Sequence, residues 1–114
     1  MIAVIFEVEP HPGQAAAYFA HAAALRAELM ATEGFVSVER FESLTQPGRF
    51  LSLSFWADEE AARRWRCHGL HRQAQQNGRS TVFAGYRLRV AEVRRDYGLT
   101  QRAQAPADSL ACLL

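Results

Sequence analysis

The order of the patterned stretches along this chain constrains its fold more than any single motif does. Residues 2–9 alternate with a period of two, which predicts a strand, and residues 13–31 follow a helical period. The next stretches predict a hairpin at residues 35–56, a second helix at about 58–67 and, after an interruption at Gly69, a shorter helix to residue 76. A long last strand is predicted at residues 81–94. The order β-α-β-β-α-β predicts an α+β protein, a ferredoxin-like sandwich with one antiparallel sheet.

Local signals mark where the predicted helices begin and end. Gln14, His21 and Glu28 recur every seven residues, which predicts a solvent-facing stripe on the first helix. Gly34 is placed to end that helix, since glycine readily adopts the backbone conformation that follows a helix. Asp58 is a good N-cap for the second helix.

Both faces of the predicted sheet carry large apolar side chains. One alternating set contains Ile5, Phe35, Phe41 and Phe83, and the other contains Phe6, Val38, Phe50 and Trp56. Two helices can cover only one face of a four-stranded sheet. The other face would form a large exposed apolar patch in a monomer, so we expect a homodimer in which two sheets pack face to face.

Composition narrows the class of protein. The 114 residues suffice for one small domain, predicted at residues 1–95, with a tail at 96–114 packing on the domain or on a partner subunit. The formal net charge of +1 gives no basis for binding nucleic acid or anionic membranes. All 13 basic residues are arginines, which excludes Schiff-base chemistry on a lysine. Neither a leader nor a membrane helix is predicted, so we expect a cytoplasmic protein.

Several segments in order resemble the antibiotic biosynthesis monooxygenase (ABM) family. They are IAVIFEVEP at the start, GFVSVERFES at 34–43, LSLSFWADEEAARRW at 51–65, HGLHRQAQQNGR at 68–79 and FAGYRLRVAEV at 83–93. The resemblance implies a dimeric α+β barrel. The family includes cofactor-free oxygenases of phenolic polyketides, quinol oxygenases and haem-degrading enzymes, so the resemblance points to the fold more strongly than to one reaction.

The second predicted helix carries the main candidate site. Trp65, His68 and Arg72 share one face if the helix continues through Gly69. In the functional interpretation Trp65 and Arg72 bind a flat substrate, and His68 moves a proton near neutral pH. His71 is the second candidate base. In the structural interpretation Trp65 belongs to the core and the others are solvated.

The last predicted strand adds further candidates. Tyr86 could hydrogen-bond a phenolic ligand or fill the core. Arg87 and Arg89 lie on the opposite face, where pairing with Glu7 or Glu39 is favoured over binding an anionic substrate.

We therefore predict a monooxygenase that oxidises a small phenol, quinol or anthrone-like substrate with dioxygen. No G-x-G-x-x-G fingerprint is present, and no cofactor is predicted. His68 and His71 have a spacing that fits a metal site, but no third ligand follows, so no metal is predicted. One alternative is a non-enzymatic small-molecule-binding or stress-associated barrel protein. A filled barrel with His68 and His71 both in open solvent would favour that alternative or an unrelated role.

Haem degradation is the further alternative that the resemblance raises. Haem-degrading relatives are similar in having an Asn on the first strand, a Trp on the second helix and an iron-ligating His ten residues later. Trp65 matches the Trp, but Gln75 stands where the His would be, and Gln is a poor iron ligand. The first strand offers Phe6 and Glu7 instead of Asn.

Overall fold

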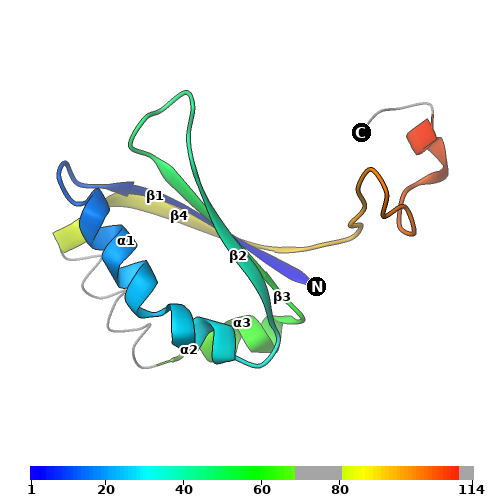
Figure 1. The fold of residues 1–114 in the computed structure, drawn as a ribbon, viewed down its shortest axis with the longest axis horizontal. Coiled ribbons are helices and arrows are strands. Elements are labelled where there is room, and N and C mark those ends of the chain that lie inside the picture. The colour runs from blue at the N-terminus through cyan, green and yellow to red at the C-terminus, as the bar shows by residue number, and fades with distance from the viewer. Residues whose placement is uncertain (69–80, 111–114) are drawn as a thin grey trace.

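The structure is a computed structural model that describes residues 1–68 and 81–110. The described chain contains four strands, three α-helices and a short 3-10 helix (Figure 1). They are β1 (Ile2–Pro10), α1 (Ala15–Ala24), α2 (Arg26–Ala31), β2 (Phe35–Glu42), β3 (Phe50–Trp56), α3 (Glu59–Arg66), β4 (Phe83–Glu92) and a 3-10 helix at Ala107–Leu110. The predicted order of strands and helices is confirmed.

The four strands form one antiparallel sheet in the order β2-β3-β1-β4. The hairpin predicted at residues 35–56 is formed by β2 and β3, and β1 lies between β3 and β4. The helices all lie on one side of this sheet (Figure 1). The architecture is the ferredoxin-like α+β fold.

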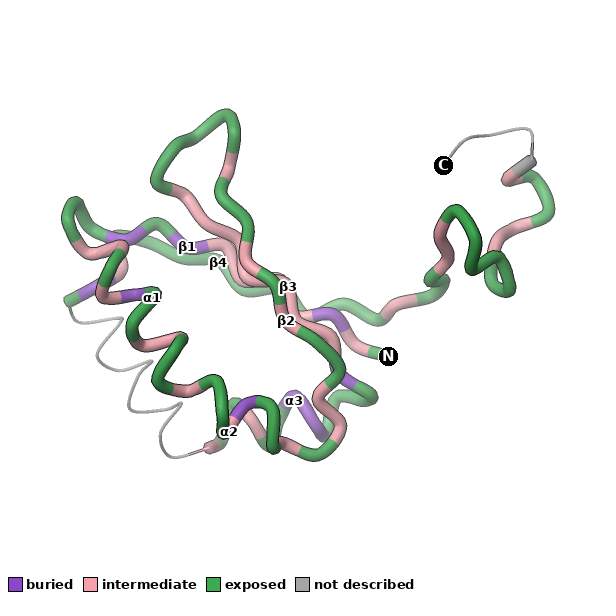
Figure 2. The backbone as a smooth tube through the Cα atoms, viewed as in Figure 1, coloured by how far each residue is buried: buried purple, intermediate pink, exposed green. Residues whose placement is uncertain are grey.

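Two small buried clusters join the helices to the sheet. One contains Leu29, Trp56, Ala61 and Ala62, where α2 and α3 meet the end of β3. The other, at the far end of β1, contains Val8, Tyr18 and Val82. Figure 2 shows these buried positions near the two ends of the helical layer, with half-buried and exposed residues between them. The helices are thus anchored at both ends, and the space between the anchors holds the site described below.

The junction between β2 and α3 follows the sequence signals. The Asp58 carboxylate accepts a hydrogen bond from the backbone N–H of Ala61, at 2.8 Å, and so caps α3. Gly34 has a φ of 86°, a conformation that glycine adopts without strain. Its carbonyl accepts a 2.7 Å hydrogen bond from the N–H of Ala57, which fixes the start of β2 beside the end of β3.

The first helix differs from its prediction in two ways. It is interrupted at Leu25, so α1 and α2 are separate helices. The predicted solvent stripe is also wrong, because Gln14, His21 and Glu28 are all half-buried while Phe19 and Met30 are exposed. Since α1 reads AAAYFAHAAA, its apolar residues lie almost all round and give the helical period little power to select the buried side.

Two irregularities in the sheet correct the predicted faces. The register of β2 against β3 shifts between Phe35 and Ser37, and that of β4 against β1 shifts around Ala84. An extra residue in a strand moves the side chains beyond it to the other face. Phe35 and Phe83 therefore pack toward the helices and do not share the face of Ile5 and Phe41. The second shift lies next to Gly85, and a glycine within a strand is typical of a bulge.

We call the sheet surface opposite the helices the open face. Its apolar centre is made by Ile5 with three side chains of β3, Leu51, Leu53 and Phe55. Beside it the Glu7 carboxylate pairs with Arg49 at 2.9 Å and with Arg89 at 3.0 Å. The predicted pairing of Arg89 with Glu7 is confirmed. No helix among the described residues covers this face.

The chain leaves the sheet after β4 and extends away from the helices (Figure 1). The N–H of Val93 still bonds to the carbonyl of Met1, at 2.9 Å. Farther on, Arg102 donates to the carbonyl of Gly98 and to the Ser109 hydroxyl, and lies over the ring of Tyr97. The segment thus bonds to itself, and its docking on the domain or on a partner stays a prediction.

None of the helices in the described ranges is both long and apolar enough to cross a membrane.

Candidate functional site

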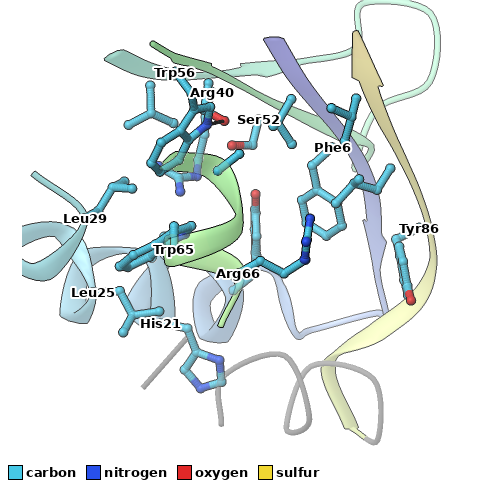
Figure 3. A pocket seen from close by; sticks show the side chains of 18 of the residues that line it. Phe6, His21, Leu25, Leu29, Arg40, Ser52, Trp56, Trp65, Arg66 and Tyr86 are labelled. Carbon is cyan, nitrogen blue, oxygen red and sulfur yellow. Dashed lines mark hydrogen bonds between the residues drawn. The ribbon is translucent and has the colours of Figure 1, made fainter. Parts of the chain in front are cut away.

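A cavity of about 400 Å³ lies between the sheet and the helices (Figure 3). This volume falls within the range of sites for small organic ligands. Its described lining is Val4, Phe6, Tyr18, His21, Ala22, Leu25, Leu29, Val38, Arg40, Ser52, Ser54, Trp56, Ala62, Trp65, Arg66, Phe83, Tyr86, Leu88 and Val90. The lining is largely apolar and aromatic, with a few polar groups.

The strand register divides the cavity floor into a polar half and an apolar half. Arg40 on β2 lies opposite Ser52 on β3, and that row continues through Phe6 on β1 to Leu88 on β4. In the next row Val38 and Ser54 are followed by valines of β1 and β4, Val4 and Val90. The β2–β3 side thus presents a guanidinium and two hydroxyls, and the β1–β4 side presents only hydrocarbon there.

The helices supply the opposite wall. Tyr18, His21 and Leu29 come from α1 and α2, while Trp65 and Arg66 come from the last turns of α3. In Figure 3 the Arg66 side chain extends across the cavity toward Phe6, and His21 lies at the lower rim. The Asp58 cap and the acidic side chains of Glu59 and Glu60 stabilise the N-terminus of α3. A stable α3 in turn helps to hold Trp65 and Arg66 toward the cavity.

Aromatic rings form the apolar end of the cavity. The Phe6 ring centroid lies 5.7 Å from those of Phe83 and Tyr86. Tyr86 is 51% exposed, so its ring lies at the edge of the cavity, as Figure 3 also shows. A flat ligand entering here would meet ring faces and edges, which aromatic groups pack against favourably.

The structure brings two of the five predicted site residues to the cavity, Trp65 and Tyr86. His68 is not in its described lining, but the His68 ring stacks on Trp65 with centroids 5.5 Å apart. The Nδ1 atom of His68 is buried and has no hydrogen-bond partner. His71 and Arg72 lie outside the described residues, as does Gln75 of the haem comparison, so their predicted roles stay predictions.

Three residues that line the cavity were not predicted as site residues from the sequence: His21, Arg40 and Arg66. His21 was interpreted as a surface residue because it shares a stripe with Gln14 and Glu28, and the half-burial of that stripe overturns this. The sequence does contain a signal for Arg40. It lies two residues after the apolar Val38 on the same strand, so alternation puts both side chains on the same face. For Arg66 we find no such signal, because it follows a run of arginines on a charged helix.

In the ranges that the structure describes, no three His, Cys, Asp or Glu side chains are grouped so that they could hold a metal ion. The Phe6 side chain lines the cavity and Glu7 faces the opposite way. The first strand therefore presents a phenyl ring where the haem-degrading relatives were expected to present an amide.

Fold and cavity together define a class: a small ferredoxin-like α+β domain with a ligand-sized apolar cavity between sheet and helices. The model of one family, antibiotic biosynthesis monooxygenase, matches residues 1–77. The chain belongs to this antibiotic biosynthesis monooxygenase (ABM) family.

Two curated proteins are similar to this chain. A protein of Pyricularia oryzae named jasmonate monooxygenase ABM is 47% identical over 93 residues, covering 82% of this chain and 43% of its own length. The uncharacterized protein YqjZ of Bacillus subtilis is 37% identical over 62 residues, covering 54% of this chain and 53% of its own. The match thus spans about half the length of these relatives.

Solved structures agree on the fold. A protein of Deinococcus radiodurans superposes with a TM-score of 0.77, at 16% identity, covering 87% of this chain and 98% of its own. At that identity the similarity concerns the fold alone.

Proposed function

We propose that this protein is a monooxygenase that oxidises a small aromatic substrate, a phenol, quinol or anthrone, inside the cavity and without a cofactor. The observation that carries the proposal is the cavity itself, with its size and its Trp65, Phe6 and Tyr86 walls. Family membership supports oxygen insertion as the reaction. The name of the Pyricularia oryzae relative, jasmonate monooxygenase ABM, supports it further.

The chemistry requires a base and a dry pocket. Removing a proton from the substrate gives an anion that transfers an electron to dioxygen far more readily than the neutral molecule does. For an anthrone, the ring methylene then becomes a carbonyl: one oxygen atom enters the product and the other leaves as water. The substrate carbon loses the four electrons that dioxygen gains, so no external reductant is required.

We assign the base to His68. The His68 ring stacks on Trp65, which lines the cavity, and its buried Nδ1 atom has no hydrogen-bond partner, and both observations support this assignment. His71 is the second candidate, from the same segment of sequence. His21 is the alternative base that the structure adds, because it lines the cavity.

Oxygen consumption with a panel of quinols, anthrones and jasmonate tests this proposal. His68→Ala should lower uptake about 100-fold or more, the usual contribution of a positioned base. The variants His71→Ala and His21→Ala show whether either of those residues is the base instead. His11→Ala is the matched control, because His11 is exposed in the β1–α1 turn, and it should leave uptake unchanged.

Other results of these experiments would favour a different base or one of the alternative functions. Undiminished uptake in His68→Ala would remove that residue from the role. Tight binding of the panel with no uptake by the wild-type protein would favour the non-enzymatic binder. Saturable haem binding with release of iron would favour haem degradation.

We also propose a homodimer formed through the open face. Ile5, Leu51, Leu53 and Phe55 give this face an apolar centre, and Phe41 beside them is 43% exposed. In a homodimer with a two-fold axis through this face, the open face of one copy covers the open face of the other. The cavity lies on the other side of the sheet and stays accessible in such a dimer.

A further inference from the structure

The cavity contains cationic side chains but no acidic one. Arg40 and Arg66 both line it. All 12 acidic side chains of the sequence lie within the described residues, and the ion pairs found there join Glu7 to Arg49 and Arg89, and Glu60 to Arg63. Neither Arg40 nor Arg66 has a side-chain carboxylate within salt-bridge distance.

Arg40 is the better placed of these two cations. It is half-buried on β2, whereas Arg66 is exposed at the end of α3. The Nε atom of Arg40 is buried and has no hydrogen-bond acceptor. A buried donor without an acceptor is destabilising, and it is rare in native proteins unless a ligand or water completes it.

Tyr18 provides a second unsatisfied donor at the same place. The guanidinium carbon of Arg40 lies 5.9 Å from the centre of the Tyr18 ring. Tyr18 is only 6% exposed, and its hydroxyl is buried without a partner. Arg40 on the sheet and Tyr18 on the helical wall thus each leave a buried donor open. Because the two residues meet, one anionic acceptor placed between them could accept from both.

The floor of the cavity indicates how the rest of such a ligand would lie. Arg40 and Ser52 form the polar end of a row that continues into Phe6 and Leu88. In Figure 3 Arg40 and Ser52 lie on one side of the cavity, and Phe6 and Tyr86 lie on the other. A ligand matching this gradient has a charged group at one end and an apolar ring system at the other.

We propose that the ligand of this cavity is an aromatic carboxylic acid whose carboxylate is bound by Arg40, with the Tyr18 hydroxyl as a further donor. The side edge of a guanidinium, Nε–H with one Nη–H, pairs with the two oxygens of a carboxylate. A phosphate dianion would need more cationic neighbours than one half-buried arginine. The inference deepens the proposed function by naming its substrate class, and it rests on the cavity being the substrate site.

Calorimetric titration under nitrogen with three probes of the same apolar body tests the inference. The probes are 1-naphthaleneacetate, its neutral analogue 2-(1-naphthyl)ethanol, and (1-naphthylmethyl)phosphonate. Wild-type protein should bind the acetate at least about 10-fold more tightly than the alcohol, since hydrogen bonds to charged groups contribute that much. Arg40→Met should remove this preference, and Tyr18→Phe should weaken acetate binding several-fold while leaving alcohol binding unchanged.

Matched variants make the result specific. Arg64→Met changes the same charge on α3 outside the cavity lining and should keep the preference. Arg40→Lys keeps the charge without the paired donors and should keep only part of it. Tyr18→Phe preserves the ring under Arg40, so it stays informative if Arg40→Met fails to fold.

Three outcomes would overturn the inference: equal binding of acetate and alcohol by the wild type, a preference lost in Arg66→Met but kept in Arg40→Met, or tighter binding of the phosphonate than of the acetate. Because no oxygen is present, the test is independent of turnover. Acetate bound through Arg40 by a protein that consumes no oxygen would support this inference and contradict the monooxygenase proposal.

Discussion

Gly34 is the residue on which the junction between the helices and the sheet depends most. Its φ of 86° favours glycine, and a Cβ placed on it would lie 2.5 Å from the Cβ of Ala61. Ala61 is fully buried under Trp56 and Leu29 and cannot move aside without disturbing that cluster. Gly48 has nearly the same φ, 87°, but nothing lies within 4 Å of a Cβ placed there.

The two glycines therefore separate backbone strain from steric overlap. Gly48→Ala should lower the free energy of unfolding by about 1 kcal/mol, the cost of a left-handed alanine. Gly34→Ala should lower it by about 3 kcal/mol, because overpacking against Ala61 is added. Urea denaturation measures the free energy of unfolding of both variants. Equal losses in the two variants would show that Ala61 moves aside without cost.

At the residue scale, sequence reasoning located side chains whose environment follows from local pattern. Asp58 caps α3 as predicted, and Trp65 and Tyr86 reach the cavity. Gly34 has the positive φ that glycine favours, but it lies two residues beyond Thr32, which is the C-cap of α2. The phase of Arg40 with Val38 indicates only which face of β2 it lies on, and His21 carries no local signal for the cavity. Their importance comes from residues distant in sequence: Arg40 meets Tyr18 across the cavity, and no spacing within β2 or α1 encodes that contact.

At the scale of elements, α3 shows how a short helix is held. Besides the Asp58 cap, its surface carries an ion pair in which Arg63 Nε donates to Glu60 Oε2 at 2.8 Å. This hydrogen bond, with the charges of Arg63 and Arg64, outweighs desolvation and lowers the pKa of the Glu60 carboxyl below 4.5, while the pair raises the pKa of Arg63. The pair supports the turn of α3 that precedes Trp65.

The pH dependence of stability should report this pair. A carboxyl whose folded pKa is lowered stabilises the fold above its unfolded pKa, near 4.5, and this contribution is lost as the pH falls through the folded value. Arg63→Gln should be less stable than wild type at about pH 7, and the difference should vanish toward about pH 2. Thermal melts across this range measure it, with Arg95→Gln as the exposed control. A difference that persists in acid would mean that Arg63 acts through packing.

Element order was predictable, but register and helix continuity were not. Alternation predicts the four strands, yet the extra residue near Val36 carries no sequence mark, and Gly85 marks the irregularity near Ala84 without fixing its register. These two shifts put Phe35 and Phe83 on the other face. The interruption at Leu25 is similar, because leucine is a good helix former and its local sequence does not predict a break.

At the scale of the whole molecule, the open face makes assembly testable. Leu53 lies at its centre on β3, so an arginine there would bury an unpaired charge in the proposed interface. Leu53→Arg should therefore give the mass of a single chain in sedimentation equilibrium, where the wild type gives twice that mass. Leu44→Arg is the control, because Leu44 is 98% exposed in the β2–β3 turn and its substitution should leave the dimer intact. A wild-type protein that sediments as a single chain at micromolar concentration would contradict the dimer.

The division of the sheet into two faces has a consequence for how this protein can change. On β1 and β3, successive residues point alternately into the cavity and onto the open face, as Ser52 and Leu53 do. Point substitutions at one set of positions thus leave the other set in place. Evolution or protein design can therefore change which molecule the domain binds by substituting the cavity-facing positions of these strands. The positions on the open face meanwhile continue to determine what the domain assembles with.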